Sequence, residues 1–191
     1  MEKIGEIIAV ESSFIVAEGK MNMLPPLGSL VETRGNATYR FLVTRLFTES
    51  RNPGRLPMAY GRPLDLLRQE QPQVFELMKW SFRAVPVGQK QFLLPENLPE
   101  IHSLLYLTPD EELMGIFKNA SFIDALFCID KEKVPERDDA VIYLIQKYIS
   151  LLDESKKEDK LLGIANRIAF LLRDDYITLK RFIDILGEYA K

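Results

Sequence analysis

The sequence predicts an α+β protein in which a small β-barrel of five or six strands precedes an antiparallel helical bundle. Two observations point to this fold class. Before Thr108 the apolar residues fall in short runs that Pro and Gly interrupt, whereas after Thr108 they recur at the three- and four-residue spacing of amphipathic helices. We therefore expect two domains, a barrel over residues 1–107 and a helical bundle over residues 108–191.

The strand segments of the first part are short and rich in β-branched and aromatic residues. They cover residues 3–10, 13–17, 29–33, 38–48 and 78–84. Turn-forming Pro and Gly between them favour a small barrel over an open sheet. The longest segment has apolar residues on both faces, with Phe41 and Phe47 on one face and Leu46 on the other. This pattern indicates a strand that crosses a closed barrel or is covered by a second layer.

Helix signals dominate the second part, and one short helix is predicted at residues 63–69, where Pro takes the first position. Residues 108–111 and 155–158 both match a capping box, in which a Thr or Ser side chain caps the first turn. Three long apolar stripes follow, at residues 141–152, 161–172 and 179–189. We expect an antiparallel bundle with Leu162 and Tyr176 in its core. The stripes are wide, so a homo-oligomer formed through these helices is a secondary hypothesis.

The composition excludes several classes of protein. Of 191 residues, 47% are hydrophobic and 28% charged, so the chain can build a core. A single Cys excludes an internal disulfide and any C-x-x-C site. The net charge of −3 argues against binding polyanions over the whole surface. The N-terminus has no signal-peptide core and no apolar run approaches the roughly 20 residues of a membrane span, so we expect a cytoplasmic protein without membrane contact.

Three segments of the first part carry a family resemblance. They are IGEII at residues 4–8, PLGSLV at residues 26–31, and PEIHSLLY with TPDEEL at residues 99–113. With these segments, residues 1–113 resemble the HAS-barrel, the small β-barrel at the front of HerA-type DNA-translocating ATPases and of rotary ATP synthase subunits. The resemblance implies a HAS-like barrel with a role in assembly, because such barrels sit at the crown of a hexameric ring and contact neighbouring subunits or partner proteins.

The chain departs from that family in its second part. No G-x-x-x-x-G-K-[ST] sequence occurs, so no P-loop cradles a triphosphate, and helices occupy the region where the family has its nucleotide-binding sheet. We therefore expect a non-catalytic assembly or adaptor protein with no cofactor. Its partner would be another protein, a separate P-loop ATPase in a HerA-type DNA-processing complex.

An arginine-rich stretch is the candidate binding site. Its members are Arg34, Arg40, Arg45, Arg51, Arg55, Arg62 and Arg68. Only two acids and no Lys lie among them, which gives a net charge of +5, whereas residues 108–191 carry 13 basic and 17 acidic residues, or −4. The planar guanidinium fork favours a specific anionic partner, so we predict that a partner protein binds here, with the loops around Arg51, Arg55 and Arg62 in contact.

Two other interpretations of these arginines stay open. In the first, the stretch binds nucleic acid directly, since aromatic residues such as Tyr39 and Tyr60 interleave with the basic ones. In the second, the aromatic rings belong to the barrel core and the arginines pair with the acidic helices of the same chain.

The sequence gives little support for a catalytic site. His102 is the only histidine, and nothing in the sequence brings it to Cys128, which we expect to be buried in a helix. Acidic pairs occur at residues 111–112, 138–139 and 174–175, near predicted helix starts, where the helix dipole favours negative charge. We predict no metal site, and a metal-dependent hydrolase built on Asp174 and Asp175 is the weakest hypothesis.

Overall fold

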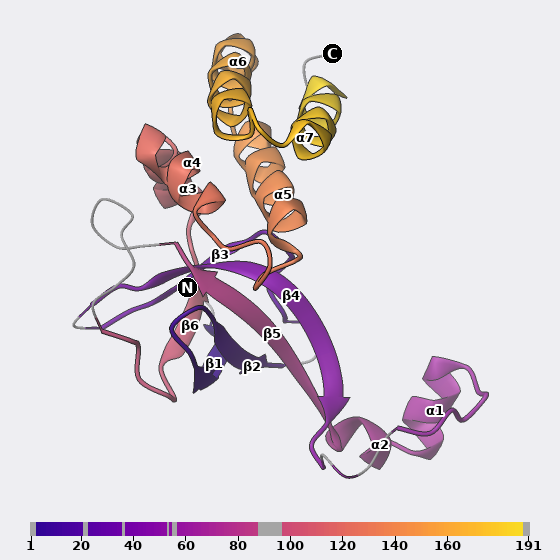
Figure 1. Cartoon of the computed structure of the whole chain (residues 1–191). Helices are drawn as coiled ribbons and strands as arrows, with labels where there is room; N and C mark the ends of the chain where they lie inside the picture. Colours follow the sequence, from indigo (N-terminus) through magenta and orange to yellow (C-terminus); the bar gives the residue numbers. More distant parts are fainter. Residues whose placement is uncertain are drawn as a thin grey trace.

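The computed structural model describes residues 3–20, 23–35, 37–52, 54, 57–87 and 97–188. Its six strands are β1 (Lys3–Val10), β2 (Ile15–Gly19), β3 (Leu30–Thr33), β4 (Arg40–Ser50), β5 (Met78–Pro86) and β6 (Leu104–Leu107). They close a barrel in the order β1-β2-β5-β4-β3-β6, and every neighbouring pair is antiparallel (Figure 1). The predicted α+β class, with an N-terminal barrel before the helices, is confirmed.

The barrel interior is a small apolar core. Phe41 and Val43 of β4, Phe82 and Ala84 of β5, and Leu105 of β6 are buried in it. The alternation of residues 78–84 therefore predicted the inward face of β5 correctly. The short β6, which alternation alone does not reveal, closes the barrel by pairing with both β1 and β3.

A β-bulge in β4 changes which residues share a face. Val43 lies opposite Ala84, but Arg45 lies opposite Arg83, so Thr44 is an extra residue on this strand. Beyond the bulge, Leu46 is opposite the inward-facing Phe82. The prediction that Phe47 shares a face with Phe41 is therefore wrong, because the inserted residue reverses the alternation.

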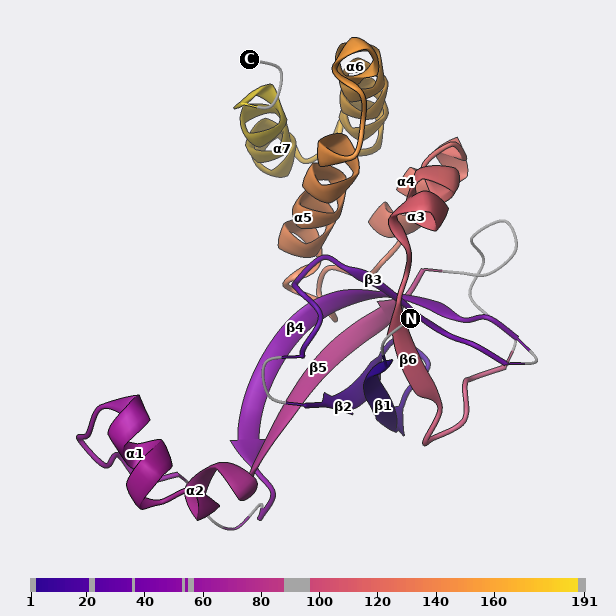
Figure 2. The ribbon, with the colours of Figure 1, turned by 180° about the vertical axis from the view of Figure 1, so that it is seen from behind.

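The paired strands β4 and β5 continue past the end of β2, whose pairing with β5 stops at Trp80, and their ends form a two-stranded arm (Figures 1 and 2). The arm carries two short helices at its end, α1 (Leu64–Glu70) and α2 (Gln73–Glu76). The predicted helix over residues 63–69 is confirmed as α1. We call residues 57–77 the arm tip, and none of them is buried.

The remaining helices gather at the opposite end of the barrel (Figures 1 and 2). They are α3 (Asp110–Ile116), α4 (Ala120–Phe127), α5 (Arg137–Ser150), α6 (Glu154–Leu171) and α7 (Tyr176–Glu188). Helix α6 packs against α4 and α7, and α5 packs against α7 and β4. Leu42 and Val85, on the outer face of the barrel, belong to the same apolar core as Ile145, Ile168 and Phe182 of the helices.

Several local expectations about the helices are wrong. Thr108 does not cap α3; its hydroxyl donates to Glu32 Oε2 (3.4 Å), and Pro109 precedes the first turn. Ser155 lies inside α6, which begins one residue earlier at Glu154. Leu162 and Tyr176 are exposed rather than in the core, because each lies on the side of its helix away from the packed neighbours. Tyr189 lies outside the described residues.

Gly28 fixes the approach of α5 to the barrel. Its φ of 78° is in the left-handed region, and its N–H donates to the carbonyl oxygen of Val43 (2.9 Å). A Cβ at this position would lie 2.5 Å from the Tyr143 Cβ and 2.6 Å from the Ala140 carbonyl oxygen. Only glycine fits here, so the turn before β3 and the first half of α5 are in direct contact.

Candidate functional site

A buried carboxylate holds two of the predicted arginines at the junction of barrel and helices. Glu32 of β3 is 1% exposed and accepts hydrogen bonds from Arg34 Nη2 (2.7 Å) and Arg40 Nε (3.2 Å). The same two guanidinium groups reach Glu112 of α3, at 3.3 Å and 2.9 Å. Two cations therefore face two anions, and this cluster carries no surplus positive charge for an external phosphate.

Arg45 stands apart from that cluster, where β4 leaves the barrel. Its Nε lies 3.7 Å from Glu136 Oε1, next to the start of α5, and its side chain is 54% exposed. Directly across the ladder lies Arg83, whose guanidinium sits over the Phe14 ring at 4.2 Å. Two like charges are therefore neighbours here, and the acid that Arg45 contacts is at the outer limit of an ion pair.

The remaining arginines follow the arm outward. Arg51 pairs with Glu18 of β2, Arg62 pairs with Glu70 of α1, and Arg68 lies over the ring of Phe75 at 5.6 Å. Arg55 lies outside the described residues.

The stretch is therefore not one continuous basic face. Arg34, Arg40 and Arg45 contact acids of the helical part, as one of the alternative interpretations expects. Of the interleaved aromatic residues, Phe41 is buried and Tyr39 packs against the barrel core, but Tyr60 is exposed on the arm tip.

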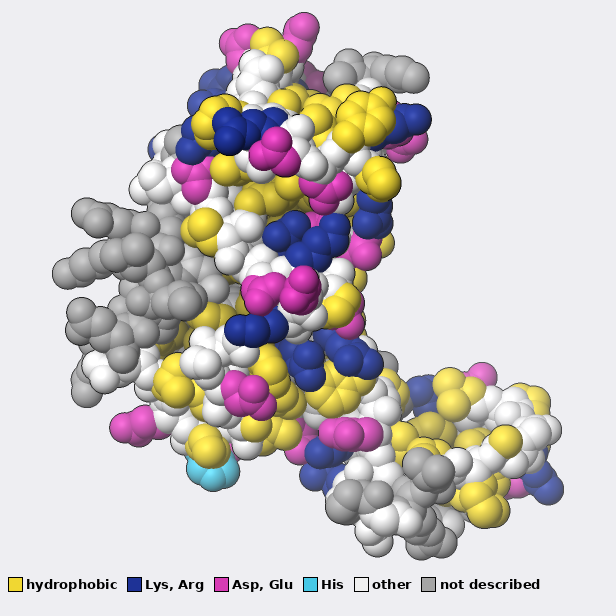
Figure 3. All heavy atoms as spheres, viewed as in Figure 1, with side chains coloured by type: hydrophobic (Ala, Val, Ile, Leu, Met, Phe, Trp, Pro, Cys, Tyr) yellow, Lys and Arg dark blue, Asp and Glu magenta, His cyan; other side chains and the backbone are white. Residues whose placement is uncertain are grey.

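Apolar side chains gather at the arm tip instead. Met58 is 74% exposed, Leu64 53% and Leu77 48%, and both Leu66 and Tyr60 are 40% exposed. Neither α1 nor α2 contains a buried residue. The space-filling view shows yellow side chains on this projection, which stands away from the main body (Figure 3). A protruding apolar surface of this kind is typical of a protein-binding site.

The helix and the arginines of the arm tip were predicted from the sequence, but its exposed apolar surface was not, although two signals were available. The first signal is the set of apolar residues within 58–77, a segment long enough only for short helices. The second is the length of the connection between β4 and β5, which spans residues 51–77. A hairpin insertion that is much longer than a barrel needs indicates a projection rather than a core element.

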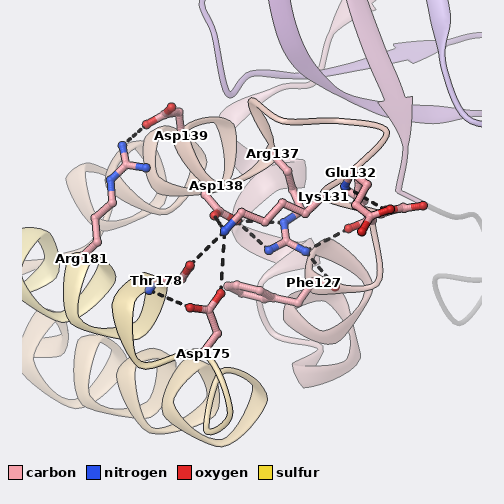
Figure 4. Close-up of polar contacts among 11 residues, drawn as sticks. Phe127, Lys131, Glu132, Arg137, Asp138, Asp139, Asp175, Thr178 and Arg181 are labelled. Carbon is pink, nitrogen blue, oxygen red and sulfur yellow. Dashed lines mark hydrogen bonds and ion pairs between the residues drawn. The ribbon is translucent and has the colours of Figure 1, made fainter.

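A second buried ion pair organises the helices (Figure 4). Arg137 donates through Nε and Nη2 to Asp138 Oδ1 (2.9 and 2.7 Å), and through Nη1 to the carbonyl oxygens of Phe127 and Ile129. Lys131 reaches the other oxygen of Asp138 at 2.8 Å. Because every polar atom of this pair has a partner within the chain, its role is to join α4, α5 and α7.

His102 and Cys128 do not meet. His102 is exposed, with a φ of 72°, and its Nδ1 lies 2.8 Å from Glu6 Oε1, a contact that lowers the pKa of the Glu6 carboxyl. Cys128 ends α4 and is exposed, which corrects the expectation that it is buried. It borders a cavity of about 300 Å³ between the barrel and the helices, lined mainly by apolar residues such as Val85 and Val134.

The acidic pairs lie at helix starts, as predicted. Asp138 and Asp139 are in the first turn of α5, and Asp175 precedes α7, where its Oδ1 accepts from the Thr178 backbone N–H (3.0 Å). Hydrogen bonds from the side chain and the backbone of Thr178 lower the pKa of Asp175 below its ordinary value. Within the described ranges, no group of three His, Cys, Asp or Glu side chains could hold a metal ion.

A scan against models of known protein families finds no match, and a search of curated proteins finds no significant relative. No helix in the part of the chain that the structure describes has both the length and the apolar character needed to cross a membrane.

Proposed function

We propose that this chain is a non-catalytic assembly protein that captures a partner protein through the arm tip. The observation that carries the proposal is that no residue of α1 is buried. An isolated helix shorter than about 12–15 residues is marginal in water, and α1 has seven residues. Its exposed Leu64 and Leu66 would be covered on binding, which would stabilise the helix and supply affinity.

The arm tip suits a helix-in-groove contact. Met58, Leu64 and Leu77 would enter an apolar groove of the partner, while Arg51 and Arg62 lie near the rim. Their exposed ion pairs with acids of the same chain contribute little to stability, so either arginine can exchange its acid for a carboxylate of the partner. The loops around Arg51 and Arg62, which the sequence singled out, thus flank the apolar anchors.

The partner we propose is a separate P-loop ATPase of the HerA type. This proposal comes from the resemblance of residues 1–113 to the HAS-barrel, with which a closed six-stranded barrel is compatible. The chain has no P-loop of its own, so any nucleotide hydrolysis would belong to the partner. An ATPase that processes DNA would place the complex in the cytoplasm.

Affinity capture tests this function. Tagged full-length chain is incubated with native lysate, with and without nuclease, and the bound proteins are identified by mass spectrometry. We expect capture of a P-loop ATPase that survives nuclease treatment and that is lost in the Leu64→Asp/Leu66→Asp variant. The control is Leu162→Asp, which places one acid on a leucine of α6 that is at least as exposed as Leu64 and Leu66.

Two outcomes would contradict the proposal. Recovery that disappears with nuclease would mean that nucleic acid is the ligand, and binding would then weaken steeply with salt because counterions are released. Equal capture by wild type and by the arm-tip variant would remove the arm tip as the site. Hydrogen exchange gives a second measurement, since the amides of α1 should exchange rapidly in the free protein and become protected in the complex.

A further inference from the structure

The outer edge of β4 is open along the arm. Among the described strands, β4 has β5 on one side and β3 on the other, but β3 pairs only with residues 40–42. The last backbone contacts on this side join Val43 to Gly28 and Ser29. From Arg45 to Ser50 the strand pairs with β5 alone, and in both views it forms the outer border of the arm (Figures 1 and 2).

Little beyond the bulge at Thr44 protects this edge against pairing with another strand. Natural sheet edges are commonly guarded by Pro, by charged side chains, by β-bulges or by a covering segment. Residues 45–50 contain no Pro, and their two charged residues, Arg45 and Glu49, have opposite signs. Both side chains are about half exposed, although Glu49 also pairs with Lys79 of β5 (2.8 Å), and Leu46 is 41% exposed.

The spacing of these charges makes the edge complementary to itself. Arg45 and Glu49 lie two residues before and two residues after Phe47, and all three side chains are on the same face of the strand. We propose that two copies of the chain pair antiparallel through the β4 edge, about a two-fold axis at Phe47. In this register Arg45 faces the partner's Glu49, and Phe47 faces the partner's Phe47.

The surroundings of Arg45 favour an added acid. Arg45 lies beside Arg83 in the ladder, and its own acid, Glu136, is 3.7 Å away. A carboxylate from a second copy would neutralise this pair of like charges. An extended segment of some other protein could also use the edge, but only an antiparallel copy of β4 is certain to bring opposite charges to both positions at once.

Charge reversal tests the dimer, because each single variant should repel a second copy of itself, whereas two different variants should attract one another. Arg45→Glu places two acids opposite one another, and Glu49→Arg places two arginines opposite one another, at both symmetric positions. Each single variant should dimerise about tenfold or more weakly than wild type in sedimentation equilibrium. An equimolar mixture of the two variants should recover the dimer, and so should the double variant Arg45→Glu/Glu49→Arg.

Three results would overturn the proposal: a monomeric wild type up to the highest soluble concentration, a dimer that neither reversal weakens, or a mixture that fails to recover association. Recovery by mixing also shows that each variant folds, which circular dichroism checks directly.

The inference does not rest on the proposed function. Both Leu64→Asp/Leu66→Asp and Leu162→Asp should leave the dimer intact. Loss of the dimer in the first variant would place the interface at the arm tip, and loss in the second would place it on the helices.

Discussion

Arg40 contacts Glu112 across the junction of the two parts, with its Nη2 2.9 Å from Glu112 Oε2. The same guanidinium group donates through Nε to Glu32, which is buried in β3. A single arginine therefore ties the barrel to the first turn of α3. Because one of its acids is buried and the other is exposed, the two contacts should differ in their contributions to stability.

Glu32→Gln should lower the free energy of unfolding by about 1.5–3 kcal/mol. The substitution removes the charge that two arginines and Thr108 contact at a buried site, where charge-assisted hydrogen bonds are strongest. Glu112→Gln removes a charge from an exposed pair and should cost less than about 1 kcal/mol. Urea unfolding of both variants measures the difference, and equal losses would show that Glu32 is not a buried charge partner.

Asp138→Ala should destabilise the chain by about 3–5 kcal/mol. The substitution leaves the guanidinium of Arg137 buried with no carboxylate. Asp139→Ala is the matched control, because Asp139 is in the same helical turn but pairs with Arg181 at the surface. We expect the control to cost less than about 1 kcal/mol in thermal or urea unfolding. A small effect at both positions would contradict the buried pair in Figure 4.

The cap of α7 should make stability depend on pH. The pKa of Asp175 is lowered in the folded chain by Thr178, so its contribution is present above the ordinary Asp pKa, about 3.9. That contribution is lost as the pH falls through the lower, folded value. The gap in melting temperature between wild type and Asp175→Ala should therefore be constant near neutral pH and shrink below about pH 4. In Asp175→Asn, which keeps an acceptor without a titrating charge, the stability should lack this pH dependence.

Local patterns predicted much of the secondary structure. Alternation identified β5 and its inward face, and apolar spacing identified the long helices. The bulge at Thr44 was not predicted, because the partner strand decides whether a residue is left unpaired in the ladder, and the sequence of β4 carries no local signal for it. Thr108 resembled a helix cap for the same reason, since its true partner is Glu32, 76 positions away.

The candidate site was harder to predict than the fold. A count of charges located the arginines but not their acids, and Glu112 is 78 positions from Arg34. Whether an apolar residue belongs to the core or to a binding surface depends on its burial in the folded chain. Leu64 and Leu161 look alike in sequence, yet one lies exposed on the arm tip and the other is buried among the helices. Such differences arise only when the whole chain is folded, because they depend on which elements pack together.

Gly28→Ala tests the contact between the barrel and α5. An added Cβ would meet Tyr143 and the Ala140 backbone at less than 3 Å, in a left-handed conformation that side chains disfavour. Together these effects should cost about 2–5 kcal/mol in urea unfolding. Gly115→Ala in α3 is the control, because nothing lies near its added Cβ and alanine favours helix, so we expect a gain of about 0.5–1 kcal/mol. A neutral Gly28→Ala would mean that α5 does not pack on this turn, since backbone shifts of a few tenths of an ångström cannot relieve overlap with a main-chain carbonyl.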